Sequence, residues 1–148
     1  MRVLPQDVIL VLLPGVVGYG SQFLCGIGEN AGDSVLFRPP AWVFGMVWPI
    51  LFLLFGISWA VAARACGNQV LCMGSYALLT LSLGAWILVY GCGKSKAGAS
   101  WILPVSLAAG FACFAQGDEV SKVLLAPLLA WLLFALLMNT TEVQNQPR

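Results

Sequence analysis

The sequence predicts an all-α membrane protein, built as a bundle of five transmembrane helices. Of its 148 residues, 60% are hydrophobic and 9% are charged, whereas a soluble domain carries roughly 25% charged residues. The mean hydropathy is +0.91. A soluble fold of this composition would expose large apolar patches to water, so the surplus apolar surface is expected to face lipid.

Five apolar runs have the length of membrane spans. A helix satisfies its own backbone hydrogen bonds in hydrocarbon and needs about 20 residues to cross it. The runs cover residues 8–24, 41–63, 70–91, 99–115 and 123–138 of one predicted domain, 1–148, and none contains a formal charge. The first run could be a signal peptide, but Asp7 interrupts a basic lead-in and Val16–Gly20 makes a poor cleavage site, so a retained span is favoured.

The composition disfavours several function classes. Histidine is absent and no Cys-x-x-Cys occurs, which disfavours a metal site or a hydrolytic triad. The net charge of +1 shows no basic stripe, so nucleic acid is not an expected partner. Uncharged spans disfavour an ion-coupled pump. The five cysteines are interpreted as small hydrophobes, with a disulfide between Cys25 and Cys92 left open.

Other patterns bear on packing and orientation. Four of the runs contain a proline, which bends a helix or is simply common in membrane helices. Pairs of small residues four apart, such as Gly56 and Ala60, allow close helix approach. Further pairs of this kind are Ser106 with Gly110 and Ala108 with Ala112. The basic residues, three on the amino-terminal side and four opposite, lean slightly toward a cytosolic carboxyl terminus.

The second run opens with two prolines, Pro39 and Pro40, followed by two tryptophans. At 100° per residue, Trp42 shares a face with Gly45, while Trp48 lies about 120° further round. Trp42 is either an interfacial belt residue or a ligand contact. Trp48 lies deeper, where packing or ligand contact is favoured. The preceding connection, residues 25–40, could fold over one end of the bundle.

The fifth run carries an aromatic and amide stripe. Pro127, Trp131, Ala135 and Asn139 are four residues apart, with Phe134 and Met138 beside them. We expect the leucines at 125, 129, 132 and 136 to face lipid, and Asn139 to cap the helix end. Tryptophan planes with a few amides and hydroxyls predict a site for a flat, largely apolar ligand, against the alternative of a purely structural bundle.

Two of these segments resemble the TspO/translocator protein family, also called the peripheral benzodiazepine receptor family. Residues 39–52 read Pro-Pro-x-Trp-Val-Phe-Gly-x-Val-Trp-x-x-Leu-Phe, and residues 124–139 read Leu-Leu-x-Pro-Leu-x-x-Trp-x-x-Phe-Ala-x-x-x-Asn. The resemblance implies a five-helix bundle, often dimeric, whose pocket binds porphyrins, sterols and drug-like ligands. The residues it implies for the pocket are Trp42, Phe44, Gly45, Trp48, Trp101, Trp131, Phe134, Ala135, Met138 and Asn139, with Pro39, Pro40 and Pro127 as structural residues.

The departures from the family pattern limit what is implied. The third run lacks the family's asparagine before Trp86, the family's loop tryptophan is Phe37, and Leu128 replaces a tyrosine. The segment 140–144 lacks the Tyr and Arg of the sterol motif, so sterol handling through that motif is not expected.

The leading hypothesis is a non-enzymatic, TspO-like membrane receptor or transporter for a porphyrin, another tetrapyrrole or a sterol-like ring, with no cofactor and no metal. One alternative is an enzyme that degrades porphyrin in light, with tryptophans as redox partners. Another is a structural subunit of a larger membrane complex. The sequence leaves open a mitochondrial outer, endoplasmic-reticulum or bacterial membrane.

Overall fold

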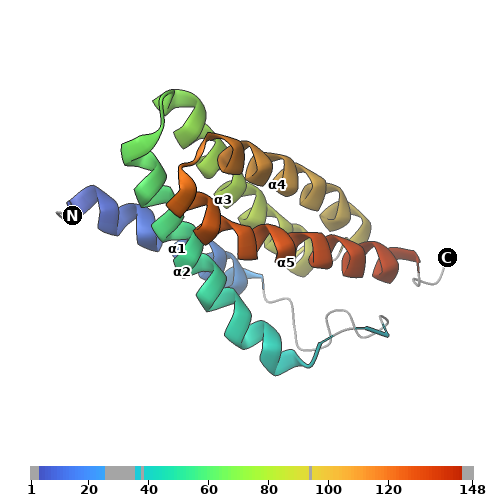
Figure 1. Ribbon diagram of the computed structural model, residues 1–148. Helices are drawn as coiled ribbons and strands as arrows, with labels where there is room; N and C mark the ends of the chain where they lie inside the picture. Colours follow the sequence, from blue (N-terminus) through green and yellow to red (C-terminus); the bar gives the residue numbers. More distant parts are fainter. Residues whose placement is uncertain (1–3, 26–35, 38, 94, 145–148) are drawn as a thin grey trace.

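The protein is a bundle of five α-helices in a computed structural model that describes residues 4–25, 36–37, 39–93 and 95–144 (Figure 1). The helices are α1 (Pro5–Leu24), α2 (Ala41–Ala65), α3 (Gln69–Gly91), α4 (Lys96–Gln116) and α5 (Glu119–Gln144). Each is long and apolar enough to cross a membrane, since 20 residues of helix extend about 30 Å. The predicted all-α, multi-pass membrane fold is therefore confirmed.

The helices α3, α4 and α5 begin before the predicted apolar runs, and a polar side chain caps the first turn of each. The side chain of Asn68 accepts a hydrogen bond from the backbone N–H of Leu71, and the Ser95 side chain accepts one from Gly98. Asp118 does the same for the N–H of Ser121 at 3.1 Å. These contacts satisfy N–H groups that the first helical turn leaves without an intrahelical partner.

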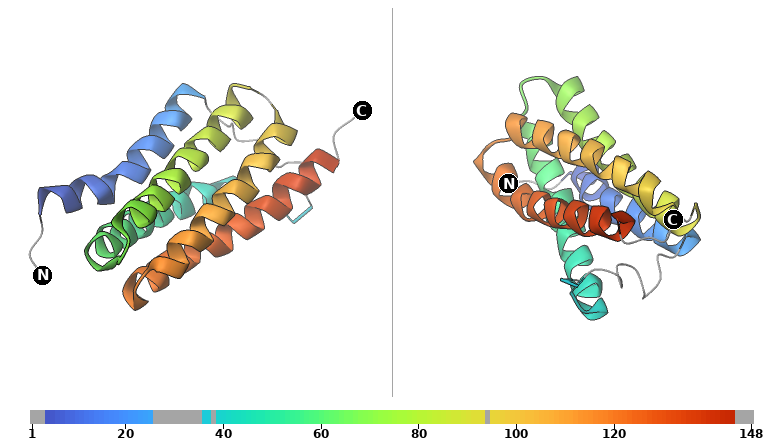
Figure 2. Two further views of the ribbon diagram at one scale, coloured as in Figure 1. Left: turned by 90° about the horizontal axis from the view of Figure 1, so that it is seen from above. Right: turned by 90° about the vertical axis from the view of Figure 1, so that its right-hand side faces the viewer.

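Each helix lies beside two main neighbours, and the five close into a ring in the order α1, α2, α5, α4, α3. Figure 2 shows α3 between α1 and α4, in agreement with these contacts. Short connections after α2, α3 and α4 make successive helices antiparallel. One end of the bundle therefore holds Arg64, where α2 ends, and the other holds Lys96, where α4 begins. We call these the Arg64 end and the Lys96 end.

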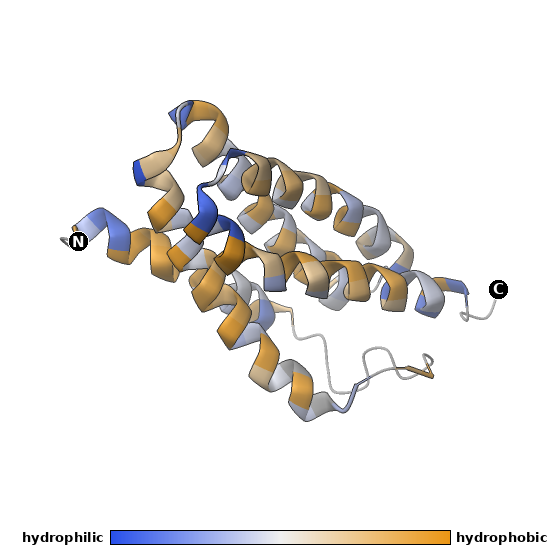
Figure 3. Cartoon of the chain, viewed as in Figure 1, coloured by the Kyte–Doolittle hydropathy of each residue, from blue (hydrophilic) through white to orange (hydrophobic). Residues whose placement is uncertain are grey.

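Polar residues gather toward the helix ends, and apolar residues dominate between them (Figure 3). At the Arg64 end, Asp7 of α1 forms an ion pair with Arg64 of α2. Toward the same end, the rings of Phe55, Trp59 and Tyr76 stack in the core, each at most 4% exposed. This stack is a closed part of the core, with no ring surface left for a ligand.

The predicted lipid face of α5 is wrong for three of its four leucines, and the fourth, Leu136, is half-buried. Leu125 and Leu132 are 0% exposed and Leu129 is 6% exposed, so these leucines belong to the core. The reason is that α5 lies between α2 and α4, and the face that carries these leucines packs inside the bundle. Within residues 123–138, the exposed residues are Val123, Ala126, Pro127, Ala130, Leu133 and Leu137.

Small residues allow close helix approach at two of the predicted positions. A Cβ added at Gly56 would collide with the backbone of Val11, so α1 and α2 meet there. A Cβ at Gly110 would collide with the Leu129 side chain of α5. Ala108, by contrast, is exposed, so its pairing with Ala112 does not build an interface within the bundle.

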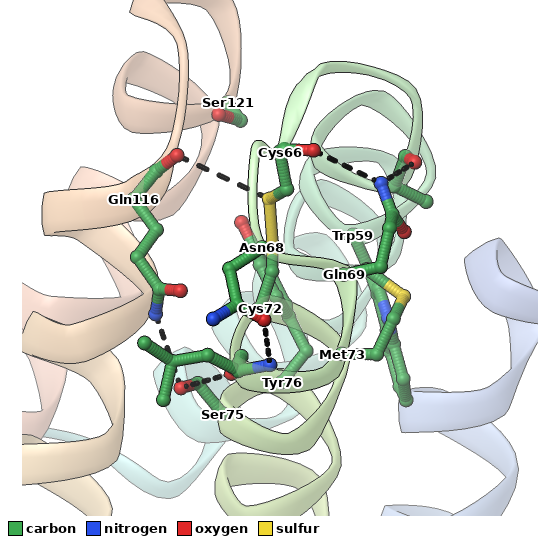
Figure 4. The surroundings of a disulfide bond; sticks show 12 residues. Trp59, Cys66, Asn68, Gln69, Cys72, Met73, Ser75, Tyr76, Gln116 and Ser121 are labelled. Atoms are coloured by element: carbon green, nitrogen blue, oxygen red, sulfur yellow. Dashed lines mark hydrogen bonds between the residues drawn. A yellow bond between two sulfur atoms is a disulfide. The ribbon is translucent and has the colours of Figure 1, made fainter.

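Four of the five cysteines form disulfides, Cys25 with Cys92 and Cys66 with Cys72. The interpretation of the cysteines as small hydrophobes therefore holds only for Cys113, which is buried and free. Figure 4 shows the second disulfide between the end of α2 and the first turn of α3, beside Gln116 of α4. One disulfide lies at each end of the bundle, so the pair favours neither membrane orientation.

Candidate functional site

Three tryptophans from three helices meet in the half of the bundle nearer the Lys96 end. The ring of Trp48 on α2 stacks against Trp86 on α3, with centroids 6.5 Å apart and planes inclined by 30°. It meets Trp131 on α5 edge-on, with centroids 6.2 Å apart and planes at 87°. Trp48 is the shared member of both contacts. We call these three residues the tryptophan cluster.

Further aromatic rings extend the tryptophan cluster along each helix. Phe52 lies 5.3 Å from Trp48, Tyr90 lies 5.5 Å from Trp86, and Phe134 lies 5.5 Å from Trp131, all between ring centroids. The partners are three or four residues from their tryptophan, so they share a helix face with it. Aromatic pairs at such distances contribute about 0.5–1.5 kcal/mol each beyond area burial.

The tryptophan cluster differs from the closed stack around Tyr76 in its exposure. Trp48, Trp86, Trp131 and Phe134 are all half-buried. The amino-terminal part of α2 projects away from the bundle (Figure 1), and Trp42, Met46 and Ile50 on it are exposed. Part of each tryptophan of the cluster is therefore accessible from outside the protein core.

The connection before α2 contributes one described contact to this region. The Phe37 ring meets the Phe134 ring edge-on, with centroids 5.9 Å apart. The predicted folding of the connection over the bundle is tested only at this point, because residues 26–35 lie outside the described part of the chain.

Asn139 holds Trp86 in place and does not cap a helix. Its side-chain oxygen accepts a hydrogen bond from the Trp86 indole nitrogen at 3.1 Å, and its amide nitrogen donates to the Lys96 carbonyl at 3.0 Å. The residue is 2% exposed. The predicted helix cap is wrong because α5 continues to Gln144, more than a turn beyond Asn139.

A charged group lies directly beyond Asn139. One carboxylate oxygen of Glu142 accepts a hydrogen bond from the Tyr90 hydroxyl at 2.6 Å and lies 2.6 Å from the Lys96 ammonium nitrogen. The group joins α3, α4 and α5 at the Lys96 end. We call Tyr90, Lys96 and Glu142 the polar cluster.

The structure brings some of the predicted site residues together and separates others. Trp48, Trp131 and Phe134 belong to one aromatic assembly, and Asn139 supports it. Ala135 and Met138 are buried in the core, 5% and 8% exposed. Gly45 and Trp42 lie on the exposed side of α2, and Trp42 is 67% exposed. The side chain of Phe44 lies outside the described part of the structure.

Trp101 lies apart from the tryptophan cluster, on the outer surface of α4. It is 78% exposed and lines an open groove of about 480 Å³ between α4 and α5. Of the predicted structural residues, Pro40 occupies the position before α2, Pro39 is half-buried beside it, and Pro127 is exposed on α5.

Sequence reasoning missed Trp86, Tyr90, Lys96 and Glu142. Trp86 and Tyr90 are four residues apart, and Glu142 follows Asn139 by three, so each pair lies on one helix face. These spacings can be read from the sequence and could have indicated the two pairs. Lys96 had no comparable signal, because its contact with Glu142 depends on how α4 and α5 lie beside each other.

The fold and this site define a multi-pass integral membrane protein with a tryptophan cluster among its helices. The profile of the TspO/MBR family matches residues 11–143 of the chain. The tryptophan-rich protein TspO of Chlorobaculum tepidum is 31% identical over 116 residues, which cover 74% of this chain and 73% of the relative. The chain therefore belongs to the TspO/MBR family.

Proposed function

We propose that this protein binds a flat, largely apolar ring compound of the tetrapyrrole class at the tryptophan cluster. The observation that carries the proposal is the contrast between the two aromatic groups. The stack around Tyr76 is closed, whereas Trp48, Trp86 and Trp131 are half-buried and leave ring surface accessible. Accessible indole planes in a membrane protein suit a flat ring, which gains by stacking and by leaving water.

The shape and polarity of the site support a ring ligand over an ion. The Trp86 nitrogen already donates to Asn139, so that polar group is engaged within the protein. A ligand there gains chiefly apolar and stacking contact. Membership of the TspO/MBR family agrees with an integral membrane protein of this architecture.

Tryptophan fluorescence tests the proposal. Protoporphyrin IX, titrated in the dark into detergent-solubilised protein, should quench emission saturably. Trp48→Phe and Trp131→Phe should each weaken binding about fivefold, since loss of one good stacking contact is worth about 1 kcal/mol. Trp42→Phe and Trp101→Phe are matched controls, because both side chains are exposed away from the cluster, and their affinity should stay at the wild-type value.

Two outcomes would overturn the proposal. One is quenching that rises linearly without saturation, which indicates partitioning of porphyrin into the micelle. The other is an equal loss of affinity in all four variants, which would show that the cluster is not the site. Saturable binding of a sterol, together with no measurable affinity for protoporphyrin IX, would move the ligand class away from tetrapyrroles.

A further inference from the structure

The polar cluster lies at one border of the tryptophan cluster. Tyr90 contacts Trp86 ring to ring at 5.5 Å and donates its hydroxyl hydrogen to Glu142. Asn139 provides a second connection, since it bonds the Trp86 indole with one atom and the Lys96 carbonyl with the other. An apolar aromatic wall therefore ends at a charged group, which is the arrangement that an amphiphilic ligand requires.

The accessible charge in the polar cluster is the lysine. Glu142 is 2% exposed, whereas the Lys96 side chain is 35% exposed. An ammonium group carries three N–H donors, and the contact with Glu142 occupies one of them. An anion that approaches this end of the bundle thus meets the Lys96 ammonium before it meets the carboxylate.

Lys96 also stands apart from the other described cations. Arg64 ends α2 and Lys122 lies in the first turn of α5, so both are at the opposite end of the bundle. Within residues 4–25, 36–37, 39–93 and 95–144, Lys96 is the basic side chain on the side of the tryptophan cluster.

We propose that Lys96, held in position by Glu142, binds the carboxylate of an amphiphilic ring ligand whose ring lies against the tryptophan cluster. This proposal rests on the proposed function and narrows its ligand class to rings that carry an acidic side chain. A hydrogen bond between ionised groups is about twice as strong as one between neutral groups, and it gains further where water is scarce. The site thereby discriminates an acid from a neutral ring of the same shape.

The test compares protoporphyrin IX, which carries two carboxylic acids, with its dimethyl ester, which has the same ring and no charge. Affinities are measured for the wild type, Lys96→Met, Lys96→Arg, Glu142→Gln and the matched control Lys122→Met. The readout is the ratio of the two affinities in each protein, so that unequal partitioning of acid and ester into micelles cancels between proteins. Circular dichroism and the thermal midpoint establish that each variant is folded.

We expect Lys96→Met to weaken binding of the acid about tenfold, since hydrogen bonds to charged groups contribute about 1.5–3 kcal/mol, and to leave the ester unchanged. Lys96→Arg retains the acid preference because it keeps the positive charge. Glu142→Gln strengthens acid binding because it removes the competing negative charge, while the amide oxygen still accepts a hydrogen bond from Lys96 and keeps it in position. Lys122→Met changes neither affinity.

A purely structural role for the Lys96 and Glu142 pair predicts a different pattern. In that case Lys96→Met weakens both ligands equally, and this result overturns the proposal. A Lys122→Met ratio that shifts as much as the Lys96→Met ratio also overturns it. If the ester and the acid both saturate with no lysine dependence, the proposed ring binding survives and the acid preference fails. If neither compound saturates, the proposed function itself fails.

Discussion

The indole nitrogen of Trp86 on α3 donates a hydrogen bond to the side-chain oxygen of Asn139 on α5, at 3.1 Å. The bond crosses between two helices that are not neighbours in the ring of the bundle. It fixes the plane of Trp86, which in turn stacks on Trp48. Asn139 is therefore a positioning residue for the tryptophan cluster.

Asn139→Leu should destabilise the protein by about 1–3 kcal/mol, because the partly buried Trp86 N–H then lacks its acceptor. The change should cost less in a Trp86→Phe background, where no indole N–H remains to be satisfied. Denaturant unfolding in mixed micelles of the two single variants and the double variant gives the coupling energy, expected at about 1 kcal/mol. Strictly additive effects would show that the bond contributes nothing.

Gly56 is a second position with a sharp expectation. Gly56→Ala should force α1 and α2 apart, because the added methyl group meets the Val11 backbone, which cannot move aside as a flexible side chain can. We expect a loss of about 1–3 kcal/mol, as for overpacked cores. Gly45→Ala in the same helix is the matched control, since nothing lies within 4 Å of its added Cβ. Thermal unfolding in detergent should separate the two variants, and equal midpoints would contradict the packing.

The order of the helices along the chain and their approximate limits could be read from the sequence, because charges lie between the apolar runs. Which face of each helix meets its neighbours could not. Helix α5 is apolar on nearly every side. Hydropathy does not separate residues that contact lipid from residues that contact another helix when both are apolar. For this reason Leu125 and Leu132 were expected on the lipid side and are in the core.

The same limit explains the partial prediction of the site. Trp48 and Trp131 stood out by spacing and by family resemblance, and the structure places them in contact. Trp101 was implied by the family resemblance alone, and it lies on the outer face of α4. Glu142 was not predicted as a site residue because it follows the apolar run. It is nevertheless among the most buried side chains of α5. Its burial follows from its contacts with Tyr90 and Lys96 on two other helices.

The cysteine pairing yields a third prediction. Proteolysis without reduction, followed by mass spectrometry, should recover linked peptides for Cys25 with Cys92 and for Cys66 with Cys72. Cys113 should react with an alkylating reagent only after unfolding, because it is 0% exposed. A Cys113→Ser variant that keeps both links is the control. Recovery of Cys113 in a crosslinked peptide would contradict the assignment.

The two disulfides should also differ in their effect on stability. Cys25 and Cys92 are 67 residues apart, whereas Cys66 and Cys72 are 6 apart. Closing the longer loop removes more freedom from the unfolded chain, about 4 against about 2 kcal/mol by chain entropy. The double variant Cys25→Ser with Cys92→Ser should therefore have a lower thermal midpoint than the double variant Cys66→Ser with Cys72→Ser. The reverse ranking would show that loop closure does not set their contributions.

Asp118, between α4 and α5, provides a prediction with a pH dependence. Hydrogen bonds from the Ser121 hydroxyl at 2.6 Å, and then from the Ser121 backbone N–H at 3.1 Å, hold the pKa of Asp118 below its ordinary value of 3.8. The carboxylate caps the first turn of α5, and Asp118→Ala should cost about 1 kcal/mol at pH 7. Because the folded pKa lies below the unfolded one, this contribution is complete above pH 3.8 and is lost as the pH falls through the lower, folded value.

The difference in unfolding free energy between wild type and Asp118→Ala should thus be constant from pH 7 to about pH 5 and shrink at still lower pH. Asp118→Asn, whose amide oxygen also caps a helix, is the control and should retain most of the stability at pH 7. A wild-type advantage over Asp118→Ala that instead grows on acidification would show that the Ser121 contacts do not favour the ionised carboxylate.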